Sequence, residues 1–168
     1  RPSIFGDFRT CRARTRDSLR TWRFRGNYMV TRNEIVEQAR GYLGTPFRHQ
    51  GRTAQGLDCV GLLIRVAKDL DLLDRMYDYT RYGKAYPPEK LIEELKTMMR
   101  VKPVWQRLPG DILVFSTPYY PCHCAIFTGS TIVHAYNLTG KVTENSLDRR
   151  WKNHLAFCFA IPGVESCN

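Results

Sequence analysis

The sequence shows no long apolar run, no recognisable signal peptide and no regular cysteine framework. No apolar stretch approaches the roughly 20 residues that a membrane-spanning helix requires, and residues 59–64 are soon followed by charge. The first residues, RPSIFGDFRT, contain no apolar segment typical of a signal peptide. The six cysteines show no framework spacing, and a chain of 168 residues can bury a core without disulfides. We therefore expect mostly free thiols and assembly in a reducing compartment.

Acidic residues are too few to balance the basic ones, and the excess is unevenly placed. The chain has 26 lysines and arginines against 16 aspartates and glutamates, a net charge of +10. Residues 1–28 hold eight arginines against two aspartates, so six of those ten charges lie there. We predict a basic extended arm over residues 1–28 and a compact domain over residues 29–168. Such an arm suits an anionic polymer, an acidic protein neighbour or nucleic acid, or is simply a solvated tail.

The order of the predicted elements indicates the fold class. Residues 31–34 read Thr-Arg-Asn-Glu, which is a capping box, and predict a helix that ends before Gly44. A second helix should start near Asp58, after a loop over residues 44–57, and a third should follow Pro87 and Pro88. Period-two and continuous apolar patterns then predict strands over residues 112–115, 122–128, 131–137, 141–144 and 155–161. Helices followed by strands predict an α+β fold with an antiparallel sheet.

Cys59 is the first candidate for chemistry. It follows the predicted loop and lies in the first turn of a buried helix. The partial positive charge at a helix N-terminus favours the thiolate, which is the reactive form of cysteine. A lone cysteine is more commonly a small buried hydrophobe, so its position alone leaves both interpretations open.

The predicted hairpin supplies partners for a thiol. Gly129-Ser130 is typical of a two-residue turn, which would pair Thr128 with Thr131. One face of the sheet would then carry His123, Ala125, Phe127, Ile132, His134 and Tyr136. His123 and His134 become diagonal neighbours, about 7–8 Å apart at the backbone. One imidazole could act as a base while the other holds its tautomer. A register slip of one residue would move one strand's set to the opposite face.

Three other features have alternative interpretations. Cys122 and Cys124 flank His123 and could bind zinc or an iron–sulfur cluster. Alternate strand residues share a face, however, so the two thiols should point away from His123, and we do not favour a metal site. His49 lies in the loop before Cys59 and could line a cleft, whereas His154 should pack or cap at the end of a short helix. We assign neither histidine a catalytic role.

Four blocks of sequence resemble the NlpC-type cell-wall endopeptidases. They are Gly44-Thr45-Pro46-Phe47-Arg48, Gly56-Leu57-Asp58-Cys59-Val60-Gly61-Leu62, the run from Leu108 to Phe115, and the hairpin from His123 to Ala135. Their order and spacing match that family over residues 31–162. The variant Thr-Pro-Phe-Arg-His-Gln looks most like the subgroup encoded in phage tail, prophage and gene-transfer-particle modules.

The resemblance implies a papain-like α+β fold and a set of roles. Cys59 would be the nucleophile, His123 the base and His134 the orienting third member, with no metal or other cofactor. Asp58 would contact the amino end of a peptidoglycan stem peptide, and Phe47 and Arg48 are further candidates for substrate binding. The expected reaction is hydrolysis of the D-γ-glutamyl to diaminopimelate bond.

The sequence departs from the family pattern at two positions. The family often has Tyr where Phe47 stands and Ser where Val60 stands. Because these positions help to bind substrate in the family, the two departures affect which bond is cleaved and whether the protein is active. We expect either a tail-tip peptidase of a virion that acts at the bacterial cell wall, or a weakly active or inactive structural part of the tail tip or baseplate. The arm would then bind tail-tip or baseplate proteins, and the protein would be found in the virion or, before assembly, in the host cytoplasm. Nucleic acid is the least favoured partner because the domain shows no motif for it.

Overall fold

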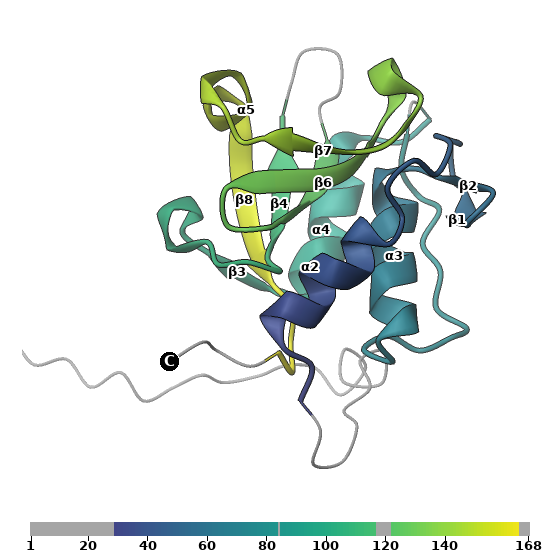
Figure 1. Cartoon of the computed structure of the whole chain (residues 1–168), viewed down its shortest axis with the longest axis horizontal. Helices are drawn as coiled ribbons and strands as arrows, with labels where there is room; N and C mark the ends of the chain where they lie inside the picture. The colour runs from purple at the N-terminus through teal and green to yellow at the C-terminus, as the bar shows by residue number, and fades with distance from the viewer. Residues whose placement is uncertain (1–28, 84, 117–121, 165–168) are drawn as a thin grey trace, which may run out of the picture.

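The computed structural model describes residues 29–83, 85–116 and 122–164. The predicted arm, residues 1–28, lies outside the described residues, as do Cys11 and Cys167, so the boundary at residue 28 stays a prediction. The larger helices come first and the sheet follows (Figure 1). The helices are α2 Arg32–Arg40, α3 Cys59–Asp69, α4 Pro88–Met98 and α5 Arg149–Asn153, with 3₁₀ turns η1 Val104–Gln106 and η2 Asn137–Thr139. The strands are β1 Arg52–Thr53, β2 Gly56–Leu57, β3 Arg100–Lys102, β4 Ile112–Phe115, β5 His123–Phe127, β6 Thr131–Tyr136, β7 Lys141–Ser146 and β8 Leu155–Ala160.

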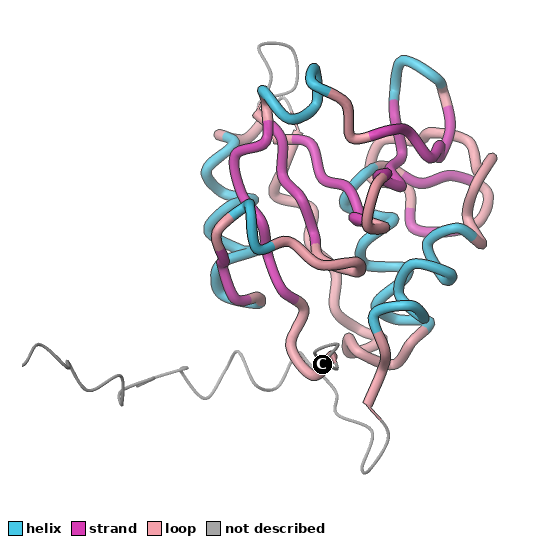
Figure 2. Tube along the Cα trace, turned by 60° about the vertical axis from the view of Figure 1, so that its left-hand side comes forward, coloured by secondary structure: helices cyan, strands magenta, loops and turns pink. Residues whose placement is uncertain are grey.

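A six-stranded sheet forms the centre of the domain. Its strand order is β3-β8-β4-β5-β6-β7, and every neighbouring pair is antiparallel. The strands twist strongly, so that β8 runs nearly at right angles to β6 and β7 in Figure 1. Figure 2 shows helical segments to either side of the strands. The α+β prediction is therefore confirmed.

Helix α2 begins as the capping box predicts. The Thr31 hydroxyl accepts from the Glu34 N–H at 3.2 Å, and the Glu34 carboxylate accepts from the Thr31 N–H at 2.8 Å. The α-helix ends at Arg40, earlier than predicted, because Tyr42 and Leu43 donate to the third residue before them rather than the fourth. The chain thus leaves the helix through a 3₁₀-like turn.

The β5–β6 hairpin has the predicted register. Phe127 lies opposite Ile132, and the Thr128 N–H donates to the Thr131 carbonyl at 3.0 Å. Gly129 has φ of +115°, a conformation that favours glycine in this turn. Consequently the side chains alternate between two apolar clusters. Cys124, Ile126, Val133 and Ala135 pack in the cluster that contains the α2, α3 and α4 residues, while Ala125, Phe127 and Ile132 pack in the cluster on the other face.

The predicted loop over residues 44–57 contains the short β1–β2 hairpin and presses closely on α3. A Cβ built on Gly61 would lie 1.9 Å from the Gly51 carbonyl oxygen, so only glycine fits at this position of the helix. The short strands carried no clear pattern, because two residues per strand are too few to show a period. The contact fixes the loop against the first turns of α3.

A buried ion cluster ties α2 to the sheet. Asp111 is fully buried and accepts from Arg32 at 2.9 Å and from Lys102 at 2.8 Å. Its carboxylate also accepts from the Leu108 N–H at 2.7 Å, which closes the turn before β4.

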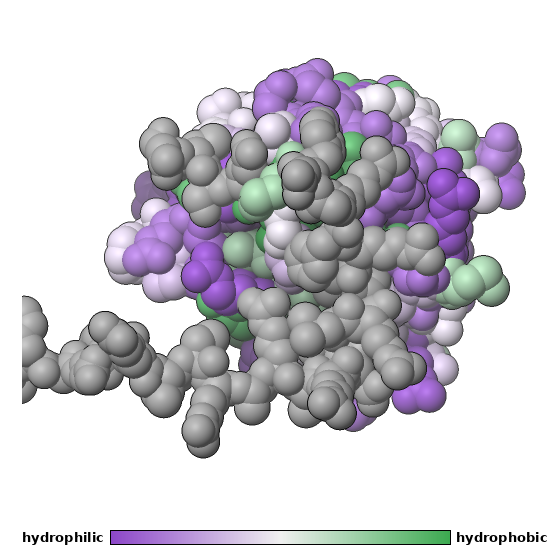
Figure 3. Space-filling view, turned by 90° about the horizontal axis from the view of Figure 1, so that it is seen from below, coloured by the Kyte–Doolittle hydropathy of each residue, from purple (hydrophilic) through white to green (hydrophobic). Residues whose placement is uncertain are grey.

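Figure 3 shows mainly hydrophilic residues on the visible part of the lower face, with small separate hydrophobic patches. Within the described ranges, no helix combines the length and apolarity needed to cross a membrane.

Candidate active site

Cys59 is the first residue of α3, as the sequence predicts, and is half-buried. The N-cap is Asp58, whose carboxylate accepts from the Gly61 N–H at 2.8 Å. A hydrogen bond with the Cys124 thiol, followed by contact with His123, lowers the pKa of Cys59 well below its ordinary value, against the effect of burial. The site therefore favours the thiolate.

Three thiols meet on the helix-facing side of the sheet. Hydrogen bonds with Cys122 and Cys59, together with burial, raise the pKa of Cys124 well above its ordinary value, so Cys124 stays a neutral donor to Cys59. All four cysteines of the described chain are free. The described residues contain no group of three or more His, Cys, Asp or Glu side chains placed to hold a metal ion.

The two predicted imidazoles are joined directly. His123 Nε2 and His134 Nδ1 lie 2.7 Å apart, and the ring centroids are 5.0 Å apart at an interplanar angle of 67°. Both side chains are buried, His134 completely. The hairpin register thus brings together the pair that the sequence placed on one face. Because His123 also contacts Cys59, the thiol and the two rings form a continuous row.

Asn145 extends this row, and sequence reasoning missed it. His134 Nε2 lies 2.9 Å from Asn145 Oδ1, and the Thr143 hydroxyl donates to the same oxygen at 2.9 Å. Thr143 lies directly opposite His134 in the β6–β7 pair. The predicted strand stopped at residue 144, one position short of Asn145. If the predicted strand had continued through Ser146, the alternation of its side chains would have placed Thr143 and Asn145 on the histidine face.

Aromatic rings cover the two imidazoles and keep His134 neutral. Tyr136 stacks on His134 at 5.0 Å, and Trp151 of α5 lies 5.0 Å from His134 and 5.7 Å from His123. Burial, followed by the neighbouring His123, lowers the pKa of His134 from 6.5 to about 4, although His134 is hydrogen-bonded to Asn145 Oδ1. At neutral pH His134 therefore has one N–H and one lone pair.

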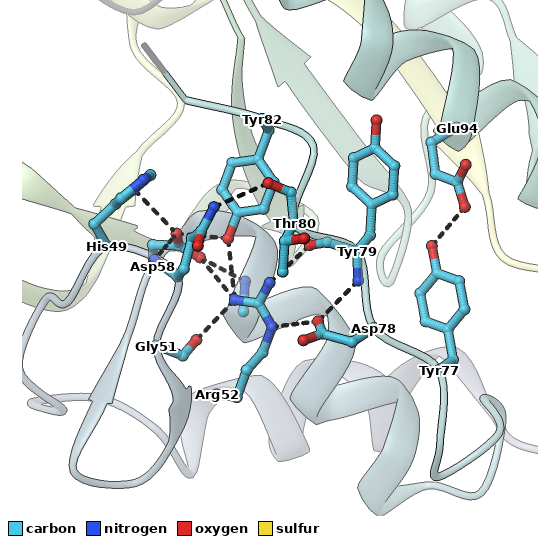
Figure 4. Close-up of polar contacts among 12 residues, drawn as sticks. His49, Gly51, Arg52, Asp58, Tyr77, Asp78, Tyr79, Thr80, Tyr82 and Glu94 are labelled. Atoms are coloured by element: carbon cyan, nitrogen blue, oxygen red, sulfur yellow. Dashed lines mark hydrogen bonds and ion pairs between the residues drawn. The ribbon is translucent and has the colours of Figure 1, made fainter. Parts of the chain in front are cut away.

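Asp58, the predicted substrate ligand, is buried and has several protein partners. Besides capping α3, it accepts from the Gln50 N–H at 2.6 Å and the Tyr82 hydroxyl at 2.7 Å. Burial, followed by the charge of Cys59, raises the pKa of Asp58. Figure 4 shows the carboxylate between the loop and Tyr82. These contacts position the N-terminus of α3, and hence Cys59.

Arg52 holds the segment that carries Tyr82 against the loop. Its guanidinium donates to Asp78 at 2.7 Å, to the Tyr79 carbonyl at 2.8 Å and to the Tyr82 hydroxyl at 3.0 Å (Figure 4). His49 is largely exposed, and its Nδ1 lies 3.7 Å from the Asp58 carboxylate. The segment over residues 78–82 is thus held beside Asp58.

The remaining predicted residues lie around this loop or inside the core. Phe47 is half-buried and its N–H donates to the Gly140 carbonyl at 2.7 Å, whereas Arg48 is exposed and covers Gly56. Val60 is buried in the helix-side apolar cluster, which explains an apolar residue there. His154 is the C-cap of α5, as expected, and its Nδ1 lies 3.2 Å from the Ser116 carbonyl oxygen.

A thiol on a helix N-terminus beside an imidazole on an antiparallel sheet defines a papain-like fold. The chain belongs to the NlpC/P60 family, a family of peptidoglycan hydrolases and peptidases, because the family model matches residues 44–158. It is also similar to dipeptidyl-peptidase 6 of Lysinibacillus sphaericus, with 32% identity over 120 residues. That match covers 71% of this chain and 38% of the relative, so the chain spans well under half of the relative's length.

Solved structures agree on the fold. The NlpC/p60 domain of the peptidoglycan hydrolase SagA matches with a TM-score of 0.57 and 24% identity, covering 79% of this chain and 100% of that domain. An NlpC/P60 family protein from Bacillus cereus matches with a TM-score of 0.59 and 14% identity, covering 80% and 41% of the two chains. The peptidoglycan hydrolase RipB from Mycobacterium tuberculosis has a TM-score of 0.52 and 19% identity, over 77% and 64%. At these identities the likeness concerns the fold.

Proposed function

We propose that this chain is a cysteine peptidase that hydrolyses the stem peptides of peptidoglycan. The observation that carries the proposal is the row formed by Cys59, His123 and His134, in which the thiol pKa is lowered and the two rings are hydrogen-bonded. A nucleophile, a base and a group that orients the base are the parts that covalent catalysis by cysteine requires. Family membership supplies the substrate class.

The reaction proceeds through an acyl-enzyme. The Cys59 thiolate attacks the carbonyl carbon of the scissile amide, and the Cys59 backbone N–H, at the start of α3, stabilises the oxyanion. His123, which has taken the thiol proton, donates it to the departing amine as the C–N bond breaks. Water, deprotonated by His123, then attacks the thioester and releases the acid together with the Cys59 thiol. We place the cleaved bond between D-γ-glutamate and diaminopimelate.

The test uses purified muropeptides of several chemotypes, with mass spectrometry of the products. Cys59→Ala should abolish cleavage while the circular dichroism spectrum stays unchanged. Cys158→Ala, which changes a buried thiol in the other apolar cluster, is the matched control and should retain cleavage. A wild-type chain that cuts no chemotype would refute the proposal, and products with other termini would refute the assignment of the bond.

We further propose that the peptidase acts at a phage tail tip, where it opens the cell wall during penetration. The support is the Thr-Pro-Phe-Arg-His-Gln motif and the basic composition of residues 1–28. The alternative is a structural part of the tail tip or baseplate with little activity, favoured by Phe47 and Val60. Particles carrying Cys59→Ala that assemble normally but penetrate poorly support the catalytic role. Normal incorporation of a chain that lacks residues 1–28 would rule out the arm as the attachment to tail proteins.

A further inference from the structure

The row of hydrogen bonds does not end at His134. It continues onto β7 through Asn145 Oδ1, 2.9 Å from His134 Nε2, and ends at the Thr143 hydroxyl, 2.9 Å from the same oxygen. Thr143 and Asn145 belong to the edge strand of the sheet and lie two residues apart, so both side chains point to the histidine face. Both are only partly exposed.

The chemistry of these groups sets the direction of every proton in the row. The Asn145 side-chain oxygen only accepts hydrogen bonds, so His134 Nε2 must donate to it. His134 is neutral, so its Nδ1 is then a lone pair and must accept from His123 Nε2–H. When His123 is neutral, its remaining nitrogen, Nδ1, is therefore the unprotonated one that is left for Cys59.

The opposite tautomer of His134 would disable the base. With its proton on Nδ1, His134 would donate to His123 Nε2, and neutral His123 would carry its own proton on Nδ1. His123 could then not accept a proton from the thiol. The group that contacts His134 Nε2 therefore determines which of the two tautomers forms.

We propose that Asn145 and Thr143 are positioning residues that fix the tautomer of His134 and thereby leave His123 able to accept the Cys59 proton. The inference rests on the proposed peptidase function. Thr143 has a distinct part in it, because an asparagine amide can turn over and present its NH₂ group. The Thr143 hydroxyl donates to Oδ1 and so keeps the oxygen, rather than the nitrogen, towards His134.

A cycle of variants tests the proposal through turnover. Asn145→Leu removes the acceptor and should lower kcat by about 10- to 100-fold, with KM within about twofold, because a hydrogen bond of a few RT selects the tautomer. Asn145→Asp keeps an acceptor and should stay within a few-fold of wild type at pH 8. Ser146→Ala, an exposed residue of the same strand, is the control and should change nothing.

The double variant distinguishes orientation from packing. Thr143→Val should lower kcat by about 10-fold, because the amide is then free to turn over. In Thr143→Val combined with Asn145→Asp, both ends of the side chain are oxygens, so turning over has no effect and kcat should return to the level of Asn145→Asp alone. If the two substitutions simply multiply, the orienting role of Thr143 is wrong.

A readout that needs no activity separates this inference from the proposed function. Long-range ¹H–¹⁵N spectra of the full chain, labelled at histidine, report which ring nitrogen carries the proton. Wild type should show His134 protonated at Nε2, and Asn145→Leu should shift the population towards Nδ1. A wild-type His134 protonated at Nδ1, or loss of turnover in Asn145→Leu with an unchanged tautomer, would overturn the proposal even if the peptidase is active. The spectra decide equally well if no cleavage is found.

Discussion

Acidification should destabilise this fold through His134 in particular. Its pKa falls from 6.5 in the unfolded chain to about 4 in the folded one. The folded state thus binds the proton less tightly, so stability is complete above pH 6.5 and is lost as the pH falls towards 4. A shift of this size corresponds to about 2 kcal/mol lost between pH 8 and pH 5, and to about 3 kcal/mol at pH 4.

Urea unfolding at a series of pH values, followed by tryptophan fluorescence, measures this loss. Other groups titrate over the same range, and Asp58 acts in the opposite direction because its pKa is raised. The free energies should therefore be compared with those of His134→Gln, which keeps a polar side chain but cannot titrate. The difference between the two proteins should shrink by about 2 kcal/mol from pH 8 to pH 5.

The same comparison can refute the reasoning. If wild type and His134→Gln show parallel curves from pH 8 to pH 4, then His134 is not held neutral by its buried setting. The argument about its tautomer would lose its basis as well, since a charged ring donates from both nitrogens.

Three further changes test other parts of the structure. Cys124→Ala removes the thiol that contributes most to the lowered pKa of Cys59, so alkylation of Cys59 by iodoacetamide at pH 6 should slow relative to wild type; an unchanged rate would show that Cys124 has no such effect. Asp111→Asn leaves two buried cations poorly paired and should lower the free energy of unfolding in urea by about 3–5 kcal/mol. Glu93→Gln, which removes one partner of a surface ion pair, should lower it by under about 1 kcal/mol. Equal losses in the two variants would contradict the assignment of Asp111 as the centre of a buried ion cluster. Gly61→Ala would place a methyl group 1.9 Å from a backbone oxygen of the preceding loop and should prevent normal folding, seen as loss of soluble protein; a stable variant with native spectra would contradict the close contact.

Local rules were enough to predict the parts of the site that depend on neighbouring residues. The capping box at Thr31 and the glycine turn at Gly129 each fix the backbone within a few positions, so both could be read from the sequence. The turn also predicted the register of the hairpin, and a known register assigns every side chain of both strands to one face of the sheet. That is why the pairing of His123 with His134 was predictable.

Contacts between distant segments were beyond the same rules. Asp58 matched a substrate-binding position by resemblance, and its bond to Tyr82 depends on how a loop 24 residues away folds back. Asn145 was missed because β7 pairs with β6 after a four-residue connection, whose geometry no dipeptide signature specifies. In both cases tertiary packing, rather than the conformational preference of nearby residues, determines which side chain forms the hydrogen bond.

Cys59 belongs to the helical layer, whereas His123 projects from the sheet and makes its aromatic contacts on the face turned away from that layer. Each layer has its own network of backbone hydrogen bonds, and apolar packing, with a few polar contacts such as that of Arg32 with Asp111, keeps the sulfur beside the ring. A slight separation of the two layers would break the sulfur–imidazole contact while every helix and strand stayed intact. Warming should therefore slow the alkylation of Cys59 before the far-ultraviolet spectrum changes, and the alkylation rate would then report how closely the two layers pack.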